Sequence, residues 1–212
     1  ALGPKVIDKI LVTRHLNGVL PEEIQKSVRS VAAISPGVMG ITGIETVEII
    51  QGVVEKLKPD LIIAIDALAA RKFSRINSTI QMSDTGVAPG AGVGNKRMTL
   101  NEQTLGVPVL ALGVPTVVDA ATLINDTMDR MLEEMIAQTE QGSAFYEMLH
   151  NMDTDEKYRL IVDILNPYVG NMFVTPKEVD AVVERLANII ANAINIAIQP
   201  GITMEDINRF TY

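Results

Sequence analysis

Asp66 is the residue of this 212-residue chain whose position most strongly indicates chemistry. It directly follows five apolar residues, Leu61 to Ile65, which form a continuous run without alternation. Such a run is typical of a strand covered on both faces, as in a parallel sheet. A carboxyl group beside that run is partly desolvated, which raises its pKa and suits it to general acid or base catalysis. With a second carboxylate nearby, the two could share a proton and activate water.

The residues after Asp66 allow a second interpretation of the same carboxylate. Ala67-Leu68-Ala69-Ala70 favours a helix, and Asp is a frequent residue at helix N-termini, where its side chain accepts backbone N–H groups. The sequence by itself therefore leaves Asp66 as either a helix cap or a catalytic group, and capping is the more common role.

Two short motifs lie in the long loop that we expect between residues 83 and 97. Asp84-Thr85-Gly86 copies the signature of well-known aspartic proteases, but no apolar strand precedes it, so a turn is the more common explanation. The glycine-rich stretch from Gly90 to Arg97 fails the phosphate-loop pattern because Lys96 follows Asn95 and no Ser or Thr follows the lysine. Lys96 and Arg97 are expected to be solvated or to pair with an acidic peptide side chain.

Composition excludes several kinds of site. The chain has no cysteine, which excludes disulfides, thiolate nucleophiles and cysteine-based metal sites. The two histidines, His15 and His150, lie in no recognisable motif, which argues against a Ser-His-Asp triad. A net charge of -8 and 4% aromatic residues argue against nucleic-acid binding. No apolar run approaches the roughly 18 residues of a membrane span, so we expect no membrane association.

The order of the expected elements predicts an α/β fold with a mainly parallel sheet flanked by helices. The polar stretch 138–144 divides the chain into an α/β domain, 1–137, and a linker with C-terminal helices, 138–212, packed on the domain or at a subunit interface. The chain starts abruptly at Ala1, as if an N-terminal strand preceded it. The expected elements are helices over 4–16, 42–58, 117–137, 154–165 and 176–198, and strands over 28–34, 61–65, 76–82 and 107–112.

Three strand ends should open on the same edge of this sheet, because ligands of parallel sheets bind at the carboxyl ends of the strands. They are Ser35 to Gly40, Asp66 to Ala70, and Gly113 to Thr116. Glycines in two of these segments allow a ligand to approach the backbone closely.

Several long blocks of the chain resemble the spore germination protease family, an atypical aspartic endopeptidase family. The resemblance covers essentially the whole chain, with an apparent deletion between roughly residues 136 and 145. The blocks are 1–6, 36–46, 62–71, 92–97, 113–120 and 174–180.

This resemblance implies a fold similar to that of hydrogenase maturation proteases, synthesis as a zymogen, and assembly as a homotetramer. It implies cleavage of small acid-soluble spore proteins in the spore core during germination, with no cofactor. One of the family's two catalytic aspartates matches Asp66. The other lies in a segment just before the block that matches Ala1, so it is expected to lie outside this chain.

The leading hypothesis is therefore an endopeptidase in which Asp66 and a second aspartate activate water. The segments 37–43 and 86–95 would shape the peptide groove, and Arg71, Lys96 or Arg97 would bind an acidic side chain. Two alternatives remain, which are a metal-dependent peptidase and an inactive fragment with a structural or oligomerising role. The candidate substrate-binding residues are Gly37, Gly40, Asp84, Lys96 and Arg97.

Overall fold

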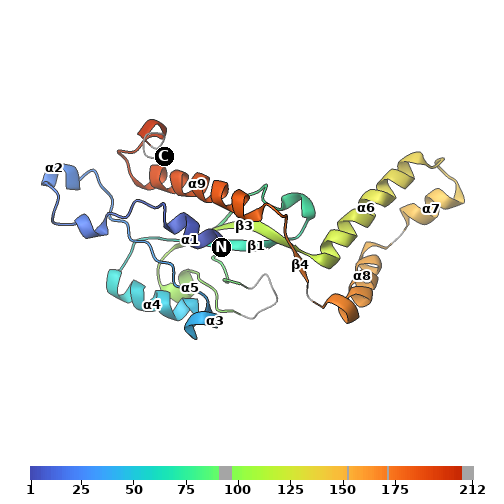
Figure 1. Cartoon of the computed structure of the whole chain (residues 1–212), viewed down its shortest axis with the longest axis horizontal. Helices are drawn as coiled ribbons and strands as arrows, with labels where there is room; N and C mark the ends of the chain where they lie inside the picture. The colour runs from blue at the N-terminus through green and yellow to red at the C-terminus, as the bar shows by residue number, and fades with distance from the viewer. Residues whose placement is uncertain (91–96, 152, 171, 207–212) are drawn as a thin grey trace.

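The computed structural model describes residues 1–90, 97–151, 153–170 and 172–206. In these residues the chain forms a mixed four-stranded sheet flanked by helices, from which a helical arm extends to one side (Figure 1). The α/β class expected from the sequence is confirmed. The sheet is mixed rather than mainly parallel, because only one of its three strand pairs is parallel.

The elements follow one another along the chain with short connections in the first half and long helices in the second. The helices are α1 (Leu2–Ile7), η1 (Arg14–Leu16), α2 (Glu22–Gln25), α3 (Met39–Thr42), α4 (Thr46–Leu57), η2 (Phe73–Arg75), α5 (Glu102–Leu105), α6 (Ala120–Gln138), α7 (Ala144–His150), α8 (Thr154–Val169) and α9 (Val179–Ile198). The strands are β1 (Ile62–Ala70), β2 (Gln81–Ser83), β3 (Val109–Asp119) and β4 (Phe173–Val174).

Strand β3 is the centre of the sheet. It pairs in parallel with β1 and antiparallel with both β2 and β4. The register places Asp66 opposite Gly113, and it shifts at a bulge between Leu68 and Ala69. Since β1 bonds to β3 on one side only, its other edge is free of strands within the described part of the chain.

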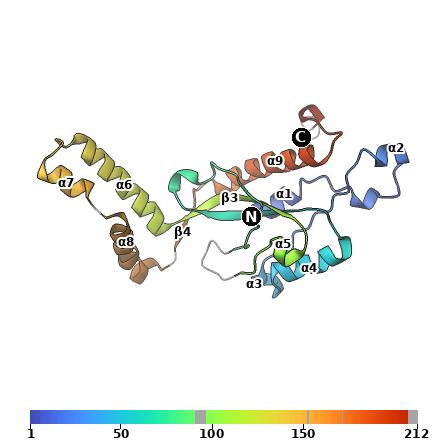
Figure 2. The same cartoon turned by 180° about the vertical axis from the view of Figure 1, so that it is seen from behind.

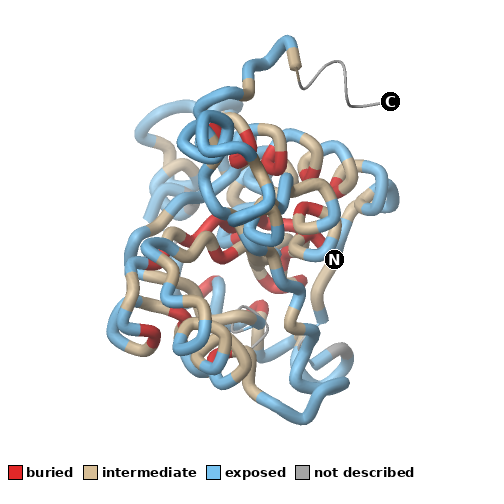
Figure 3. The backbone as a smooth tube through the Cα atoms, turned by 90° about the vertical axis from the view of Figure 1, so that its left-hand side faces the viewer, coloured by how far each residue is buried: buried red, intermediate tan, exposed pale blue. Residues whose placement is uncertain are grey.

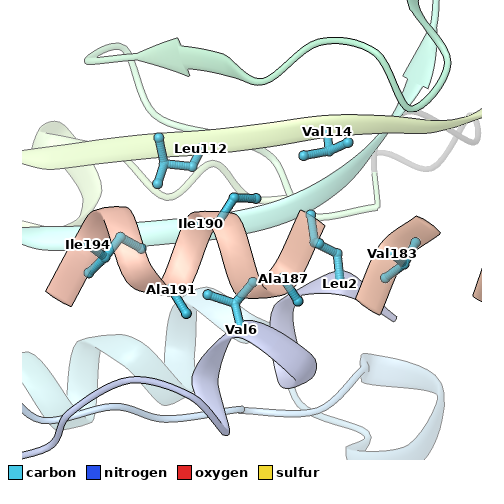
Figure 4. Close-up of a cluster of buried hydrophobic side chains, with 9 residues drawn as sticks. All are labelled: Leu2, Val6, Leu112, Val114, Val183, Ala187, Ile190, Ala191 and Ile194. Carbon is cyan, nitrogen blue, oxygen red and sulfur yellow. The ribbon is translucent and has the colours of Figure 1, made fainter. Parts of the chain in front are cut away.

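The larger core cluster lies where α9 crosses the sheet. Figure 4 shows α9 between β3 and α1, with side chains from all three elements meeting. Helix α9 is long and apolar enough to cross a membrane by length and composition. Its apolar face, however, packs into this cluster, which accounts for its composition. The buried members are Leu2, Val6, Leu112, Val114, Val183, Ala187, Ile190, Ala191 and Ile194.

Polar side chains also attach α1 and the residues that follow it to α9. The buried Asn195 accepts the Leu11 N–H at 3.0 Å and donates to the Lys9 carbonyl at 3.0 Å. Lys5 and Lys9 both form ion pairs with Glu184, at 2.6 and 2.9 Å, and their hydrogen bonds lower the pKa of Glu184 to about 2.

A second, smaller cluster covers the other face of β1. Val47 of α4 and Leu105 of α5 pack there against Ala64 and Val109 of the two parallel strands. The sheet therefore lies between α1 and α9 on one face and α4 and α5 on the other. Figure 3 shows the buried stretches gathered between these layers, while most of the outer surface is exposed.

Helices α6, α7 and α8 form an arm that extends away from the sheet (Figures 1 and 2). Asp119 caps α6, since its carboxylate accepts the Thr122 N–H at 3.0 Å. Helix α8 folds back along α6, and Lys157 of α8 is buried in an ion pair with Asp129 of α6. The chain then returns to the sheet through β4 and α9.

Both parallel strands run further than the sequence analysis expected. Strand β1 continues through Asp66 to Ala70, so the helix expected after Asp66 does not form. Strand β3 likewise continues through Gly113 and Pro115, and α6 begins at Ala120 instead of Val117. The ladder between β1 and β3 overrides the local helix preference of Ala67 to Ala70, because each strand supplies the other's backbone partners.

The N-terminal quarter of the chain departs further from the elements expected from the sequence than the two parallel strands do. The helix expected over 4–16 is divided into α1 and η1, and the residues between them are irregular. The strand expected over 28–34 is not formed, because no strand of the described chain pairs with it. The edge strand expected over 76–82 is shortened to β2, and the helix expected from 42 starts at Thr46.

Replacing Asn195 tests the polar connection between α9 and the chain after α1. In Asn195→Ala, the Leu11 N–H and the Lys9 carbonyl lose their partner, and we expect the free energy of unfolding to fall by roughly 2 kcal/mol. Urea denaturation measures this change. Asn192→Ala, on the same helix but without a side-chain hydrogen bond in the described structure, is the matched control and should differ little from the parent protein. Equal losses in the two variants would contradict the assignment.

Candidate functional site

Asp66 is the fifth residue of strand β1 and does not lie at a helix terminus. Its side chain is half-buried. The cap interpretation of Asp66 is therefore wrong, because no helix follows it. A carboxylate within a paired strand has no local structural role of that kind, which strengthens the case for a chemical role.

The surroundings of Asp66 favour its neutral form. Burial raises the pKa of the Asp66 carboxyl group, and two backbone N–H groups offset part of that rise. Oδ1 accepts the N–H of Ala67 at 2.9 Å, and Oδ2 accepts that of Gly90 at 3.4 Å. A carboxyl group with a raised pKa holds a proton more readily than an ordinary aspartate, which suits it to general acid–base chemistry.

The loop that carries Gly90 to Asp66 is fixed by Gly86. This glycine has φ +87°, and a Cβ atom there would lie 2.1 Å from the Leu100 carbonyl oxygen. The close approach allows Val87 and Leu100 to form a two-way backbone bridge, at 3.0 and 2.8 Å. Gly86 thus determines where the following residues pass Asp66.

Asp66 lines one end of a long slot with a volume of 1290 Å³. The slot follows the free edge of β1 from Leu61 to Asp66 and lies between α1 and α4. Its other wall is formed by residues 29–39. Most of the lining is apolar, and Asp66 is one of several charged side chains that interrupt it.

Two of the candidate substrate-binding residues line this slot together with Asp66. Gly37, with φ +80°, lies on the wall opposite β1. Arg97 also lines the slot, but its Nη1 donates to Glu45 Oε1 at 3.3 Å. The charge of Arg97 is therefore already balanced, which makes it a weaker candidate for binding an acidic side chain.

The other candidate residues do not gather there. Gly40 is exposed on α3, and Asp84 is exposed in the turn after β2; neither lines the slot. Lys96 and the stretch 91–95 lie outside the described residues. Arg71, the remaining cation proposed from the sequence, lies just past β1 and lines a separate pocket of 490 Å³ with Asn125, Asp126 and Tyr158.

Neither histidine accompanies Asp66. His15 is exposed on η1, and His150 stacks on Tyr146 in α7, with ring centroids 5.7 Å apart. Within the described ranges, no group of three or more His, Asp or Glu side chains is arranged to hold a metal ion. Asp66 also forms no hydrogen bond with another carboxylate in the part of the chain that the structure describes.

Two members of this site were missed in the sequence. Gly90 was expected only within a nucleotide motif or as part of the groove segment 86–95, and its backbone N–H was not expected to donate a hydrogen bond to Asp66. Glu45 was not identified as a site residue from the sequence. Its backbone N–H bonds to Glu48, and its carboxylate forms an ion pair with Arg97. The opposite charges of Glu45 and Arg97 were a visible signal, but their separation of 52 residues gave no indication of contact.

A sequence model of the germination protease family matches residues 1–138 and 130–211. The chain belongs to the germination protease family. It is 60% identical over 210 residues to a germination protease of Clostridium perfringens, covering 99% of this chain and 65% of the relative. It is 51% identical to that of Caldanaerobacter subterraneus, over all of this chain and 65% of the relative. Family membership confirms the resemblance inferred from the sequence blocks.

The relatives are longer than this chain, which spans about 65% of their length. The alignment with the germination protease of Bacillus mycoides, at 44% identity, extends over 243 positions and covers all of this chain and 66% of the relative. That relative therefore carries inserted residues. The two family matches overlap at 130–138, which agrees with a deletion close to the predicted position.

Gly86→Ala tests how the loop beside Asp66 is fixed. The added Cβ would clash with the Leu100 backbone in addition to the strain of a positive φ, so we expect the free energy of unfolding to fall by about 2 kcal/mol or more. Gly142→Ala is the control, since Gly142 has φ +81° but no atom within 4 Å of the added Cβ. The Gly142→Ala variant therefore measures the backbone strain of a positive φ without a steric clash. Thermal unfolding of both variants measures the difference, and equal shifts would contradict the role of the close approach.

The raised pKa of Asp66 predicts a stability that depends on pH. The folded state holds this proton more tightly than the unfolded state, so the contribution of Asp66 to stability falls as pH rises from its unfolded pKa through its folded pKa. We expect Asp66→Asn to be more stable than the parent protein at pH 7, with the difference shrinking toward pH 3. Urea titrations across this range measure it. A difference that grows toward acid would contradict the raised pKa.

Proposed function

We propose that this chain is the Asp66-bearing part of an endopeptidase that cleaves small acid-soluble spore proteins during germination. Its membership of the germination protease family supports the peptidase activity. The single observation that points to the site is Asp66, a half-buried carboxyl group with raised pKa inside a paired strand and at the rim of a slot. The substrate and the spore-core location come from the family resemblance.

The proposed mechanism needs a second carboxylate. Asp66 and an aspartate from outside these 212 residues would hold one proton between them and activate a water molecule for attack on the peptide carbonyl. The raised pKa of Asp66 supports this role, because a carboxyl group of that kind retains a proton more readily. The Gly90 N–H would orient the carboxylate through its bond to Oδ2.

The resemblance also supports three further proposals about the whole protein. They are synthesis as a zymogen, a sheet topology like that of the hydrogenase maturation proteases, and assembly as a homotetramer. The arm is compatible with assembly because it leaves large apolar side chains exposed, among them Met131, Met148, Leu160 and Ile164. Such exposed apolar side chains often belong to subunit contacts.

Asp66→Asn in the full-length protein tests the proposed role. Asparagine keeps the shape of the side chain but cannot transfer a proton, so we expect kcat/KM for a spore-protein substrate to fall by about 10³-fold. Asp84→Asn, in the exposed turn, is the control and should retain nearly full activity.

The same assay separates the aspartate mechanism from a metal mechanism. Cleavage by the parent protein should persist in a strong chelator. Near-normal cleavage by Asp66→Asn, or loss of cleavage in the chelator, would overturn the proposal that a pair of aspartates activates the water.

A further inference from the structure

The turn between η1 and α2 contains the pair Asn17-Gly18, and no other asparagine of the chain precedes a glycine. Asn17 has φ -60° and ψ 125°, Gly18 has φ +79°, and the Val19 N–H donates to the Leu16 carbonyl at 3.0 Å. These values are those of a type II turn, whose third residue has the positive φ that glycine adopts freely. Asn17 and Gly18 are both exposed, in the part of the molecule that lies opposite the helical arm (Figure 1).

The backbone N–H of Gly18 is unpaired. The peptide group between the two central residues of a type II turn takes no part in the hydrogen bond of the turn. The Gly18 nitrogen also forms no hydrogen bond with any other residue that the structure describes. Glycine has no side chain to shield this nitrogen, and no atom lies within 4 Å of the place where a Cβ atom would be. The nitrogen is therefore open to the neighbouring Asn17 side chain.

One hydrogen bond holds the Asn17 side chain. Its Nδ2 donates to Ser30 Oγ at 3.1 Å, at the exposed surface. Together with the bonds of Thr13 to Arg29 and Val31, it joins the turn to residues that line the slot. A single exposed bond between neutral groups restrains a side chain weakly, because water replaces either partner at little cost.

We propose that Asn17 is a site of spontaneous covalent modification, in which its side-chain amide is lost as ammonia. The Gly18 nitrogen gives up its proton and attacks Asn17 Cγ, which closes a five-membered succinimide ring and releases Nδ2 as ammonia. One water molecule then opens the ring at either of its two carbonyl groups and leaves aspartate or isoaspartate. In sum, one amide and one water become one carboxylic acid and one ammonia, so the reaction needs no oxidant, metal or enzyme.

The attack requires a rotation about the Asn17 Cα–C bond, because at ψ 125° the side chain and the Gly18 nitrogen point apart. This rotation breaks the hydrogen bond between Leu16 and Val19 and the bond from Asn17 to Ser30. Both bonds belong to a surface turn, and opening a surface turn locally requires far less free energy than global unfolding. The reaction can therefore proceed in the folded protein.

Asn77 shows how the same chemistry is prevented elsewhere in the chain. It precedes another small residue, Ser78, but the Ser78 N–H donates to the Arg75 carbonyl at 3.3 Å, and Asn77 Oδ1 is buried. The other asparagines precede larger side chains, except Asn192, which is followed by Ala193 inside helix α9. The free nitrogen and the exposed turn therefore single out Asn17.

The products change how the turn is held. Aspartate keeps an acceptor at position 17 but has no N–H to donate to Ser30, and isoaspartate adds a methylene group to the main chain. Either product adds one negative charge to a chain of net charge -8. As the protein ages, we expect the connection from the turn to Ser30, and with it to the wall of the slot, to weaken. The proposal does not depend on peptidase activity.

Peptide mapping of aged full-length protein tests this assignment. The folded protein is kept at pH 7 and at pH 9 in water enriched in heavy oxygen, and is then digested with pepsin in acid, where ring closure is slow. We expect the peptide that contains Asn17 to gain one heavy oxygen and to separate into aspartate and isoaspartate forms. Conversion should be at least about tenfold faster at pH 9 than at pH 7, because the attacking nitrogen must lose its proton. The peptide that contains Asn77 is the internal control and should remain unmodified.

Two variants test the route of the reaction. Asn17→Gln should abolish the modification at this position, because glutamine would have to close a less favourable six-membered ring. Gly18→Ala should slow it at least about tenfold, because the added methyl group shields the nitrogen. A synthetic peptide of residues 13–22 gives the rate without the fold. Unmodified Asn17 in folded protein at pH 9, after the time in which this peptide is largely converted, would overturn the proposal, as would equal conversion at Asn77 or an unchanged rate in Gly18→Ala.

Discussion

Strand β3 is the constraint on which the site depends, because β1, β2 and β4 all take their backbone partners from it. Its parallel ladder with β1 places Asp66 opposite Gly113. A Cβ at Gly113 would lie 2.3 Å from Leu68 Cδ1, so the lack of a side chain there allows Leu68 to pack across the ladder. The burial that raises the pKa of Asp66 is thus a consequence of strand pairing and not of any nearby charge.

The two parallel strands could be located from the sequence because a strand covered on both faces has an uninterrupted apolar run. The residues at which these strands end could not be predicted in the same way. Ala67 to Ala70 favours a helix locally, and Gly113 with Pro115 is typical of a turn. The ladder outweighs both preferences, since each strand continues as far as its neighbour supplies hydrogen bonds. The helix-capping alternative for Asp66 is wrong for the same reason, because β1 continues where that alternative requires a helix.

The remainder of the site could not be predicted because it depends on contacts between distant residues. The Gly90 N–H reaches Asp66 only because Gly86 allows the loop to pass close to Leu100. Arg97 meets Glu45 through the packing of α4 beside the slot. In contrast, α9 was well located from its sequence, because its apolar face has a helical period and its length exceeds five turns.

The slot and the electrostatics of Asp66 are linked. Any group that fills the slot beside Asp66 would remove water from the side of the carboxyl group that faces it, and this loss would raise its pKa further. The N–H groups of Ala67 and Gly90 oppose that effect by stabilising the ionised form. The balance between desolvation and these two hydrogen bonds therefore decides how readily Asp66 keeps its proton when the slot is occupied.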